Sequence, residues 1–354
     1  MDKKDEIIAQ QMELIRSMTE ENLRRVQSDL WGAGAPPKSS PHKASGRAGA
    51  PSKKDDAPPK TATGAPSKDA APVPAEPLPK EDMADLQAEL EGYIGLENIK
   101  KEVKNLINIA RIYQKRRENE LPTADLSLHM VFSGNPGTGK TMIARFMARV
   151  YHSLGILSKG QLVEVDRSGL VAGYVGQTAI KTQKVIAAAT GGVLFSDEAY
   201  TLTATGAEND FGQEAVDTVL KAMEDHRDDL IVIVAGYTEL MQDFVESNPG
   251  LRSRFNRYLE FADYTPEEML AIFQRNCEKS CYTPEDEALA ALKTYFSGMD
   301  PATLSDFGNA RGVRNTFEKI LSCQADRLAQ MEEITREDLM QITEADVKVA
   351  VGLN

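Results

Sequence analysis

Apolar and polar positions divide the chain into stretches of different character. Over 1–31 the apolar residues recur at roughly helical spacing with charges between them, which predicts one amphipathic helix. Its heptads are irregular, so we expect a docking or interaction helix rather than a long coiled coil. Residues 32–80 contain 11 of the 17 prolines but only two large apolar residues, Val73 and Leu78. So little apolar surface cannot offset the entropy of ordering the chain, and we expect a disordered linker.

From Glu81 onward the pattern is that of a globular protein. Helical spacing at 83–90 and 99–117 is followed by short apolar runs that alternate with helical stretches. We expect strands at 128–133, 161–166, 192–197, 230–236 and 258–261. Strands separated by helices imply a parallel sheet covered on both faces, here over 81–264. We expect an all-helical subdomain over 265–354, with helices near 266–280, 285–298, 309–330 and 335–349.

Composition narrows the class of protein. The chain is 41% hydrophobic and 27% charged, which is ordinary for a globular protein with a sizeable core. No run approaches the ~18–20 apolar residues of a spanning helix, and no apolar signal segment follows the first methionine. We therefore expect a cytoplasmic protein without membrane insertion. The net charge is −13, and residues 81–354 alone carry −15, which disfavours nucleic acid as a partner.

The three cysteines are too few for a disulfide scaffold and suit a reducing compartment. Cys277 and Cys281 have the i, i+4 spacing of one helical face. No histidine or third cysteine lies near them in the sequence, whereas a zinc site needs about four ligands. We expect both to be buried free thiols.

The strongest chemical signal is the sequence GNPGTGKT at 134–141, which follows an apolar strand and precedes a helical stretch. Its glycines let backbone N–H groups turn toward phosphate oxygens, and the helix N-terminus adds a favourable dipole. Lys140 is placed to reach the β- and γ-phosphates of a nucleotide, and Thr141 to hold Mg²⁺. The residues expected around the nucleotide are Gly134, Asn135, Pro136, Gly137, Thr138, Gly139, Lys140, Thr141 and Met142.

A second signal is the apolar strand that ends in two adjacent carboxylates, Asp197 and Glu198. Asp197 stands where a carboxylate that helps to hold Mg²⁺ is expected. Glu198 can orient and deprotonate an attacking water. An acidic pair at a strand end is usually only a solvated turn, but after a phosphate loop in the same domain the functional interpretation is favoured. A water-activating Glu also favours ATP hydrolysis over a small-molecule kinase.

Arginines mark two further places. Arg252 and Arg254, just before the last strand, are either surface charges or fingers that reach a γ-phosphate across a subunit boundary, which would imply an oligomer. In the helical subdomain, the segment GNARGVRN contains Arg311 and Arg314. We expect Arg311 to contact phosphate and couple closure of the helical lid to the nucleotide, and we leave Arg314 open between that and an exposed cation.

An aromatic residue between glycines occupies the loop AGYVGQ, at Tyr174, Val175 and Gly176. An exposed aromatic side chain is costly unless it binds something. Either Tyr174 packs on its own domain, or in a ring of subunits it faces the central channel and grips an unfolded chain.

Taken together, these residues resemble the AAA+ ATPases, and more closely the CbxX/CfqX family. That family includes the red-type Rubisco activases and stage V sporulation protein K, and it is similar to ATPases of type VII secretion. The resemblance runs from about Gly92 to the C-terminus. It rests on GYIGLENIKKEV, GNPGTGKT, AGYVGQTAIKT, GVLFSDEAY, NPGLRSRF and GNARGVRN.

The resemblance implies a role for each of these positions. Lys140 and Thr141 would be the Walker A residues, and Asp197 and Glu198 the Walker B pair. Arg254 would be the arginine finger with Arg252 beside it, Arg311 the sensor-2 residue and Tyr174 the aromatic of the pore loop. Ile94 and Gly95 stand where such proteins enclose the adenine. Where many relatives have a polar Asn after the fourth strand, this chain reads VAGYTE, so Tyr237 or Thr238 would replace it.

We therefore expect a P-loop NTPase of the AAA+ type with ATP and Mg²⁺ as cofactors. It would be a Mg-dependent ATPase assembled as a homo-oligomer, a hexamer, that remodels a protein partner. One alternative is a loader-type ATPase acting on nucleic acid, which predicts basic channel loops and hydrolysis stimulated by DNA. Another is a module in which ATP only gates assembly, so that Glu198→Gln would keep its biological activity.

Overall fold

The computed structural model describes residues 77–122, 127–174, 176–203 and 211–353. The helix predicted over 1–31 and nearly all of the linker predicted over 32–80 lie outside this part. Of the linker, 77–80 are described as coil, and the Leu78 N–H donates to the Lys159 carbonyl oxygen at 3.0 Å. The end of the predicted linker therefore lies along the folded part.

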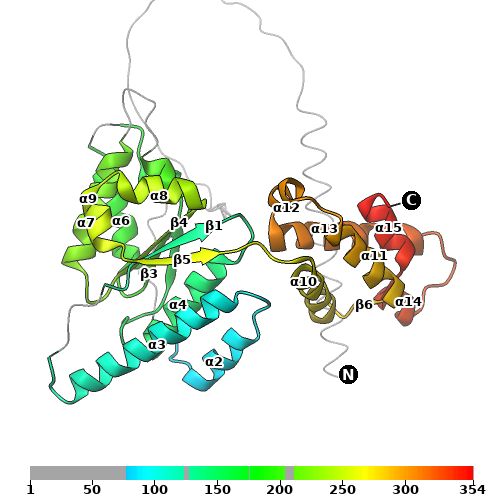
Figure 1. Ribbon diagram of the computed structural model, residues 1–354, viewed down its shortest axis with the longest axis horizontal. Coiled ribbons are helices and arrows are strands. Elements are labelled where there is room, and N and C mark those ends of the chain that lie inside the picture. The colour runs from blue at the N-terminus through cyan, green and yellow to red at the C-terminus, as the bar shows by residue number, and fades with distance from the viewer. Residues whose placement is uncertain (1–76, 123–126, 175, 204–210, 354) are drawn as a thin grey trace, which may run out of the picture. The chain divides into compact units, whose positions relative to one another are not determined.

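A five-stranded parallel sheet carries the first folded part (Figure 1). Its strands are β1 (Met130–Gly134), β2 (Leu162–Val165), β3 (Val193–Ser196), β4 (Ile231–Gly236) and β5 (Arg257–Phe261). Their order is β2-β3-β4-β1-β5, and Met130 of β1 is level with Ile233 on one side and Arg257 on the other. All five predicted strands are present, with bounds within two residues of those expected.

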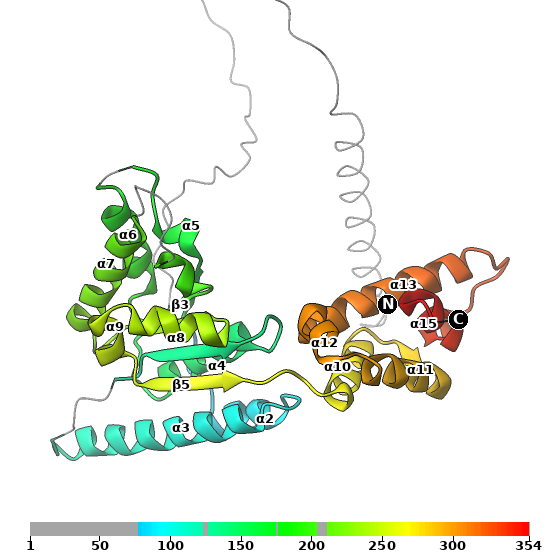
Figure 2. The same ribbon diagram turned by 45° about the horizontal axis from the view of Figure 1, so that its top comes forward.

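Successive side chains along each strand point to opposite faces of the sheet, and both faces are buried, as expected for continuous apolar runs. Phe132, Phe195 and Ile233 point to one face, which is covered by α2 (Met83–Glu91), α3 (Glu97–Glu118) and α4 (Lys140–Ser153). Val131, Leu194 and Val232 point to the other face. That face is covered by α6 (Thr178–Ala189), α7 (Gly212–Asp225), α8 (Thr238–Glu246) and α9 (Pro249–Arg254) (Figure 2). Two short elements follow β2 and β3, namely α5 (Arg167–Leu170) and the 3₁₀ helix η1 (Ala199–Leu202).

The C-terminal part is built on a separate core, in which Phe273, Phe296 and Phe317 meet. Its helices are α10 (Pro266–Lys279), α11 (Asp286–Ser297), α12 (Pro301–Phe307), α13 (Asn309–Leu328), α14 (Arg336–Met340) and α15 (Glu344–Val351). The prediction of an all-helical part is wrong in one detail, because β6 (Thr283–Pro284) and β7 (Gln341–Ile342) pair in parallel. β7 divides the helix expected over 335–349, since Thr335 and Thr343 each begin a new helix with a capping box.

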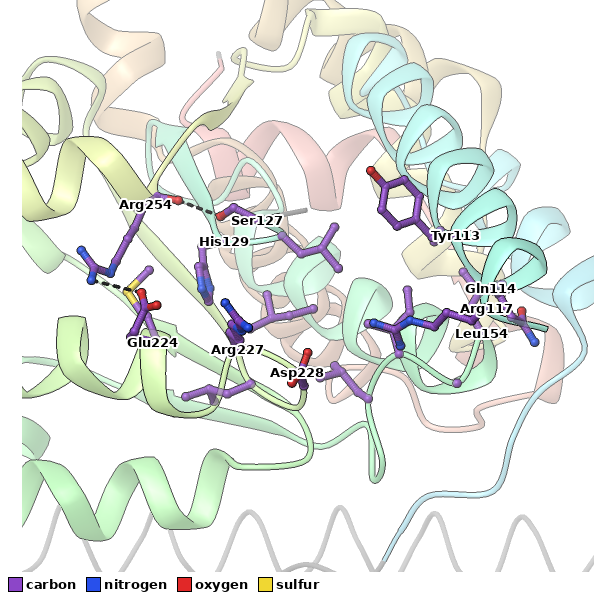
Figure 3. A pocket seen from close by; sticks show the side chains of 18 of the residues that line it. Tyr113, Gln114, Arg117, Ser127, His129, Leu154, Glu224, Arg227, Asp228 and Arg254 are labelled. Carbon is purple, nitrogen blue, oxygen red and sulfur yellow. Dashed lines mark hydrogen bonds and ion pairs between the residues drawn. The ribbon is translucent and has the colours of Figure 1, made fainter. Parts of the chain in front are cut away.

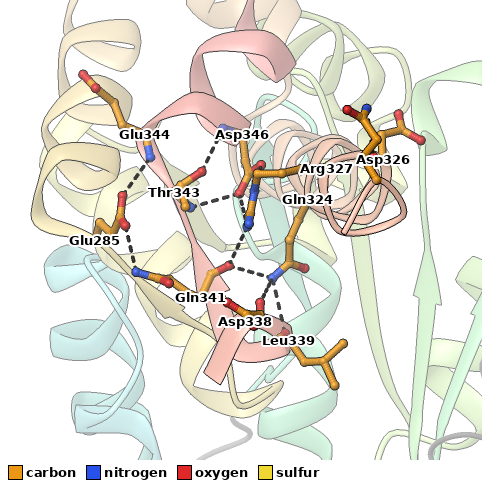
Figure 4. Close-up of polar contacts among 11 residues, drawn as sticks. Glu285, Gln324, Asp326, Arg327, Asp338, Leu339, Gln341, Thr343, Glu344 and Asp346 are labelled. Atoms are coloured by element: carbon orange, nitrogen blue, oxygen red, sulfur yellow. Dashed lines mark hydrogen bonds and ion pairs between the residues drawn. The ribbon is translucent and has the colours of Figure 1, made fainter. Parts of the chain in front are cut away.

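Polar side chains hold β7 and α15 onto α13 (Figure 4). The Gln324 amide donates to the Gln341 carbonyl oxygen at 2.7 Å. The Arg327 guanidinium donates to both carboxylate oxygens of Asp346, at 2.9 and 3.0 Å. Burial alone opposes ionisation of Asp346, but the bonds from Arg327 and Thr343 outweigh it and lower the pKa of this carboxyl.

The two cysteines of α10 and its end have different environments. Cys277 is buried, and burial raises the pKa of its thiol to about 12. Cys281 is exposed, so the prediction that both are buried is wrong for this residue. The helix ends at Lys279, and Cys281 has a φ of 58° in the turn that follows, which carries it off the buried face. In the described part of the chain no group of three or more His, Cys, Asp or Glu could hold a metal ion.

No helix in the described residues is long and apolar enough to cross a membrane.

Candidate functional site

The predicted phosphate loop joins the carboxyl end of β1 to the start of α4. Gly134, Gly137 and Gly139 all have positive φ, which glycine adopts without the strain that other residues incur. The Lys140 ammonium folds back over the loop and donates to the carbonyl oxygens of Gly134 and Asn135, at 2.7 and 2.8 Å. Thr138 is fully buried, Thr141 is half-buried and Met142 is exposed.

Four charged groups converge around this loop. Burial lowers the pKa of Lys140, and the charge of Arg311 acts in the same direction, whereas Asp197 and Asp263 act against it. An ammonium and a guanidinium near each other beside helix-terminal N–H groups form an environment suited to a polyanion. The residues of the loop thus fit a nucleotide polyphosphate.

The predicted carboxylate pair lies at the same edge of the sheet, because parallel strands end together. The Asp197 N–H donates to the Val165 carbonyl oxygen at 2.9 Å, and the Asp197 side chain accepts from the Glu198 N–H at 3.0 Å. Glu198 is exposed and left-handed, with a φ of 48°. Such a backbone costs about 1–3 kcal/mol and persists where the surroundings enforce it. Leu96 and Asn309 also have a left-handed backbone, and both lie beside the phosphate loop.

Ile94 and Gly95 lie where the start of α10 meets the phosphate loop. A methyl group added at Gly95 would lie 2.8 Å from Cδ of Glu268 and 3.3 Å from the Tyr264 ring. One added at Gly139 would lie 3.5 Å from the Tyr264 hydroxyl. The segment predicted to enclose an adenine is therefore next to the phosphate loop, and Tyr264, which the sequence did not single out, stands between them.

The start of α13 also lies over the phosphate loop. The Ala310 N–H donates to the Gly137 carbonyl oxygen at 3.2 Å, which places exposed Arg311 one residue further along the helix. Arg314 pairs with Glu318 at 3.2 Å, as expected of an exposed cation on a helix. Asp263 and Asn309 complete this contact through side chains, and the sequence prediction gave neither a role.

The two residues proposed to replace the missing Asn follow β4. Tyr237 and Thr238 are both exposed, and the Tyr237 ring centroid lies 6.2 Å from that of Tyr200. Burial raises the pKa of Tyr200, and the charges of Glu198 and Asp197 add to this effect. Tyr237 is thus joined to the carboxylate pair through Tyr200, a residue that the prediction missed although it ends the segment GVLFSDEAY.

Arg254 lies at the amino ends of the strands, away from the phosphate loop. Figure 3 shows its side chain beside Glu224 and its backbone beside Ser127. Its carbonyl oxygen accepts from Ser127 Oγ at 2.8 Å, and Ser127 precedes the first residue of β1. Its guanidinium is 3.3 Å from Glu224, and its buried Nε has no hydrogen-bond partner among the described residues. The side chain borders a cavity of about 420 Å³ at the amino ends of β1 and β4.

A strand rises about 3.3 Å per residue, so the length of β1 separates Arg254 from Lys140 by roughly 15 Å or more. Arg252 points elsewhere, since residues two apart on a helix do not share a side. It lines a different hollow, with Tyr258 and Gln242. The charges that act on Lys140 are those of Asp197, Arg311 and Asp263, and neither Arg252 nor Arg254 is among them.

The loop between α5 and α6 exposes its aromatic residue. Tyr174 is 73% exposed, which disfavours packing on its own domain. Methyl groups added at Gly173 or Gly176 would meet no described atom within 4 Å, and Val175 lies outside the described residues. Gly173 at the base of this loop and Glu198 line one open hollow of about 430 Å³, with Arg167.

Comparison with known proteins agrees with this geometry. Residues 130–263 match the ATPase family associated with various cellular activities (AAA), and residues 265–352 match the AAA lid domain. The chain is 40% identical over 268 residues to stage V sporulation protein K of Bacillus subtilis, covering 75% of this chain and 83% of that protein. It is 40% identical over 273 residues to protein CbbX of Cereibacter sphaeroides, covering 77% and 87%.

A solved structure shares the fold at lower identity. The FIGL-1 AAA domain in complex with ADP superposes with a TM-score of 0.51 and 20% identity, over 77% of this chain and 91% of that one. The chain thus has a nucleotide-binding ATPase domain followed by a lid, and the domain supports ATP hydrolysis. It belongs to the CbxX/CfqX family of AAA ATPases.

Proposed function

We propose that the protein is an ATP-hydrolysing ring motor, a hexamer, that remodels or threads a protein partner through a central pore. The observation that carries this proposal is the division of the site between two edges of the sheet. Lys140, Asp197 and Glu198 lie at the carboxyl edge, and Arg254 lies at the amino edge, where its Nε has no partner within the part of the chain that the structure describes. A guanidinium placed there completes a site only when a second copy of the chain presents its carboxyl edge to it.

Within each site, Lys140 and Arg311 bind the phosphates. Thr141 and Asp197 would hold Mg²⁺, which would supply positive charge to neutralise the phosphates. Glu198 accepts a proton from the attacking water. Arg254 of the neighbouring subunit stabilises the charge that develops on the transferring phosphoryl group.

A protein partner fits the remaining features better than nucleic acid does. Residues 81–354 carry a net charge of −15, which repels a phosphate backbone. The loop that would face the pore exposes Tyr174 rather than lysine or arginine. Gly173 and Glu198 line the same hollow, so a change at the hydrolytic Glu has a short route to the pore loop. We infer that hydrolysis moves this loop and pulls on a bound chain.

The arginine assignment is tested by paired variants of the full chain. Arg254→Ala should lower turnover by on the order of 10³-fold or more while nucleotide binding persists. Arg252→Ala is the matched control, because it removes the same group from the other side of α9. If Arg252→Ala causes the loss instead, the assignment to Arg254 is wrong. If neither variant slows hydrolysis, no arginine of α9 acts as a finger.

The partner class is tested with a trap. Glu198→Gln with ATP should hold the client, and mass spectrometry of the co-purifying material then identifies it. Stimulation of ATPase activity by DNA would favour the loader-type alternative, and full biological activity of Glu198→Gln would favour ATP-gated assembly. We further propose that residues 2–31 recruit the partner and that residues 32–80 join them to the ATPase domain. Unchanged partner pull-down and localisation after their deletion would refute that role.

A further inference from the structure

We propose that Asp263 and Asn309 are positioning residues that hold Arg311 over the phosphate loop and transmit the state of that loop to the lid. The proposal rests on the proposed function, since it assigns these side chains to the same ATP site. Neither residue belongs to the phosphate loop, the carboxylate pair or the arginines described above. Asp263 lies between β5 and α10, and Asn309 is the first residue of α13.

Asp263 links the loop to the lid through its carboxylate. Both of its oxygens accept from Nδ2 of Asn135 in the phosphate loop, at 3.0 and 2.9 Å. One of them also accepts from Nδ2 of Asn309, at 2.8 Å. A single acceptor-only group thus connects two amides that come from different parts of the fold.

Asn309 is fully buried, and its side-chain amide both donates and accepts hydrogen bonds. Its Nδ2 donates to the Pro136 carbonyl oxygen at 3.2 Å as well as to Asp263, and its Oδ1 accepts from the Tyr264 N–H at 2.9 Å. Its φ of 55° is left-handed, a conformation that Asn adopts more readily than most residues. An amide that both donates and accepts in a left-handed backbone is the chemistry that this position requires, and Asp supplies only the acceptor.

The two residues after Asn309 connect it to the phosphate loop. Ala310 donates its N–H to Gly137, and Arg311 follows with its charge acting on Lys140. Movement of Asn135 or Pro136 when phosphate enters the loop therefore shifts Asp263 and Asn309 directly. Because these bonds are at least partly buried and those to the Asp263 carboxylate are charge-assisted, they hold the start of α13 in one position rather than many.

The test exchanges the two side-chain types in the full-length protein. Asn309→Asp places two carboxylates against each other and should lower kcat/KM for ATP by about 10- to 100-fold. The double variant Asp263→Asn/Asn309→Asp restores one donor and one acceptor between the two positions but not the bond to the Pro136 carbonyl oxygen, and should recover kcat/KM by at least about 3-fold over Asn309→Asp. Asn315→Asp is the matched control, because it adds the same charge to an exposed position on α13 and should change nothing.

A double-mutant cycle with Arg311→Ala distinguishes a role in positioning Arg311 from an effect on the stability of the fold. In an Arg311→Ala background, Asn309→Asp should cost less than about 3-fold, because the group it positions is gone. The inference would be overturned if Asn309→Asp lowered kcat/KM equally in the parent and in Arg311→Ala. It would also be overturned if Asp263→Asn/Asn309→Asp were no more active than Asn309→Asp. A parent protein that hydrolyses no ATP would instead refute the proposed function. In that case amide exchange of Ala310 tests the inference. Faster exchange in Asn309→Asp than in Asn315→Asp would support it, and equal exchange would overturn it.

Discussion

The contact between the phosphate loop and the lid makes a strong prediction for one glycine. A methyl group at Gly137 would collide with the carbonyl oxygen of Gly308 and would lie 3.0 Å from the Arg311 backbone nitrogen. Neither neighbour can rotate away, because both belong to the backbone. Gly137→Ala should therefore push the start of α13 away from the loop and break the bond from Ala310 to Gly137.

Gly308→Ala is the matched control, because it isolates the free-energy cost of the collision from the cost of backbone strain. The two glycines have nearly equal φ values, 76° and 79°, so an alanine at either incurs the same strain of about 1–2 kcal/mol. At Gly308 the methyl group would meet no described atom within 4 Å. Only Gly137→Ala adds the lost hydrogen bond, about 1 kcal/mol, and the displacement of α13. We expect the collision to add about 2 kcal/mol in total, a factor of about 30 in local opening.

The assay is amide hydrogen exchange of the segment that contains Ala310, measured without nucleotide so that no collision with a ligand contributes. Exchange should be about 30-fold faster in Gly137→Ala than in Gly308→Ala. Equal exchange in the two variants would show that backbone strain alone is responsible. In that case the reasoning from the contact between the phosphate loop and α13 is refuted.

Three further predictions concern other parts of the molecule. Glu198→Gln should lower ATP turnover by about 10²- to 10⁴-fold while fluorescent ADP still binds, and loss of binding would mean that Glu198 is structural. Asp346→Asn should destabilise the lid by about 2 kcal/mol at pH 7 in chemical denaturation, whereas Glu344→Gln, which breaks an exposed pair, should cost under about 1 kcal/mol. Because the pKa of Asp346 is lowered on folding, this difference should begin to shrink as the pH falls through 3.8, the ordinary value, and should be lost as the pH falls through the lower pKa of the folded state. A difference that does not shrink below pH 3.8 would contradict the ion pair. Burial, assisted by Arg254, lowers the pKa of His129 from 6.5 to about 4, so the unfolded chain binds the extra proton and the parent should lose up to about 3 kcal/mol as the pH falls from 6.5 to 4. His129→Gln should lack this part of the pH dependence, and identical curves for parent and variant would exclude a buried neutral His129.

The sheet could be predicted because both of its faces are buried. Each strand is then a continuous apolar run, and Ile231–Gly236 is a clear example. The interruption of the last predicted helix was missed because β7 has only two residues, too few for a periodic pattern. The capping boxes that begin at Thr335 and Thr343 were the available signal. Cys281 shows the limit of helical spacing, since the helix ends before the second cysteine is reached.

The candidate site could be predicted where its residues are contiguous in the sequence. The order of glycines and Lys140 carries its own physical reason, and so does the acidic pair after β3. Asn309 and Asp263 are separated by 46 positions, and no pattern within either segment shows that the lid brings them together. Nor could spacing separate Arg252 from Arg254, although the structure does, because Arg254 borders the cavity at the amino ends of β1 and β4 and Arg252 lines a different hollow.

The central claim is that two copies of the chain share one site, and a mixing experiment tests it most directly. Glu198→Gln keeps its arginine but cannot activate water, and Arg254→Ala keeps its carboxylates but offers no finger. Each variant alone should be inactive. Mixed in equal amounts with re-assembly, they should recover about a quarter of the parent ATPase activity, since random assembly sets an intact Glu198 beside an intact Arg254 at that frequency. A mixture as inactive as its components would contradict a site built across the subunit boundary.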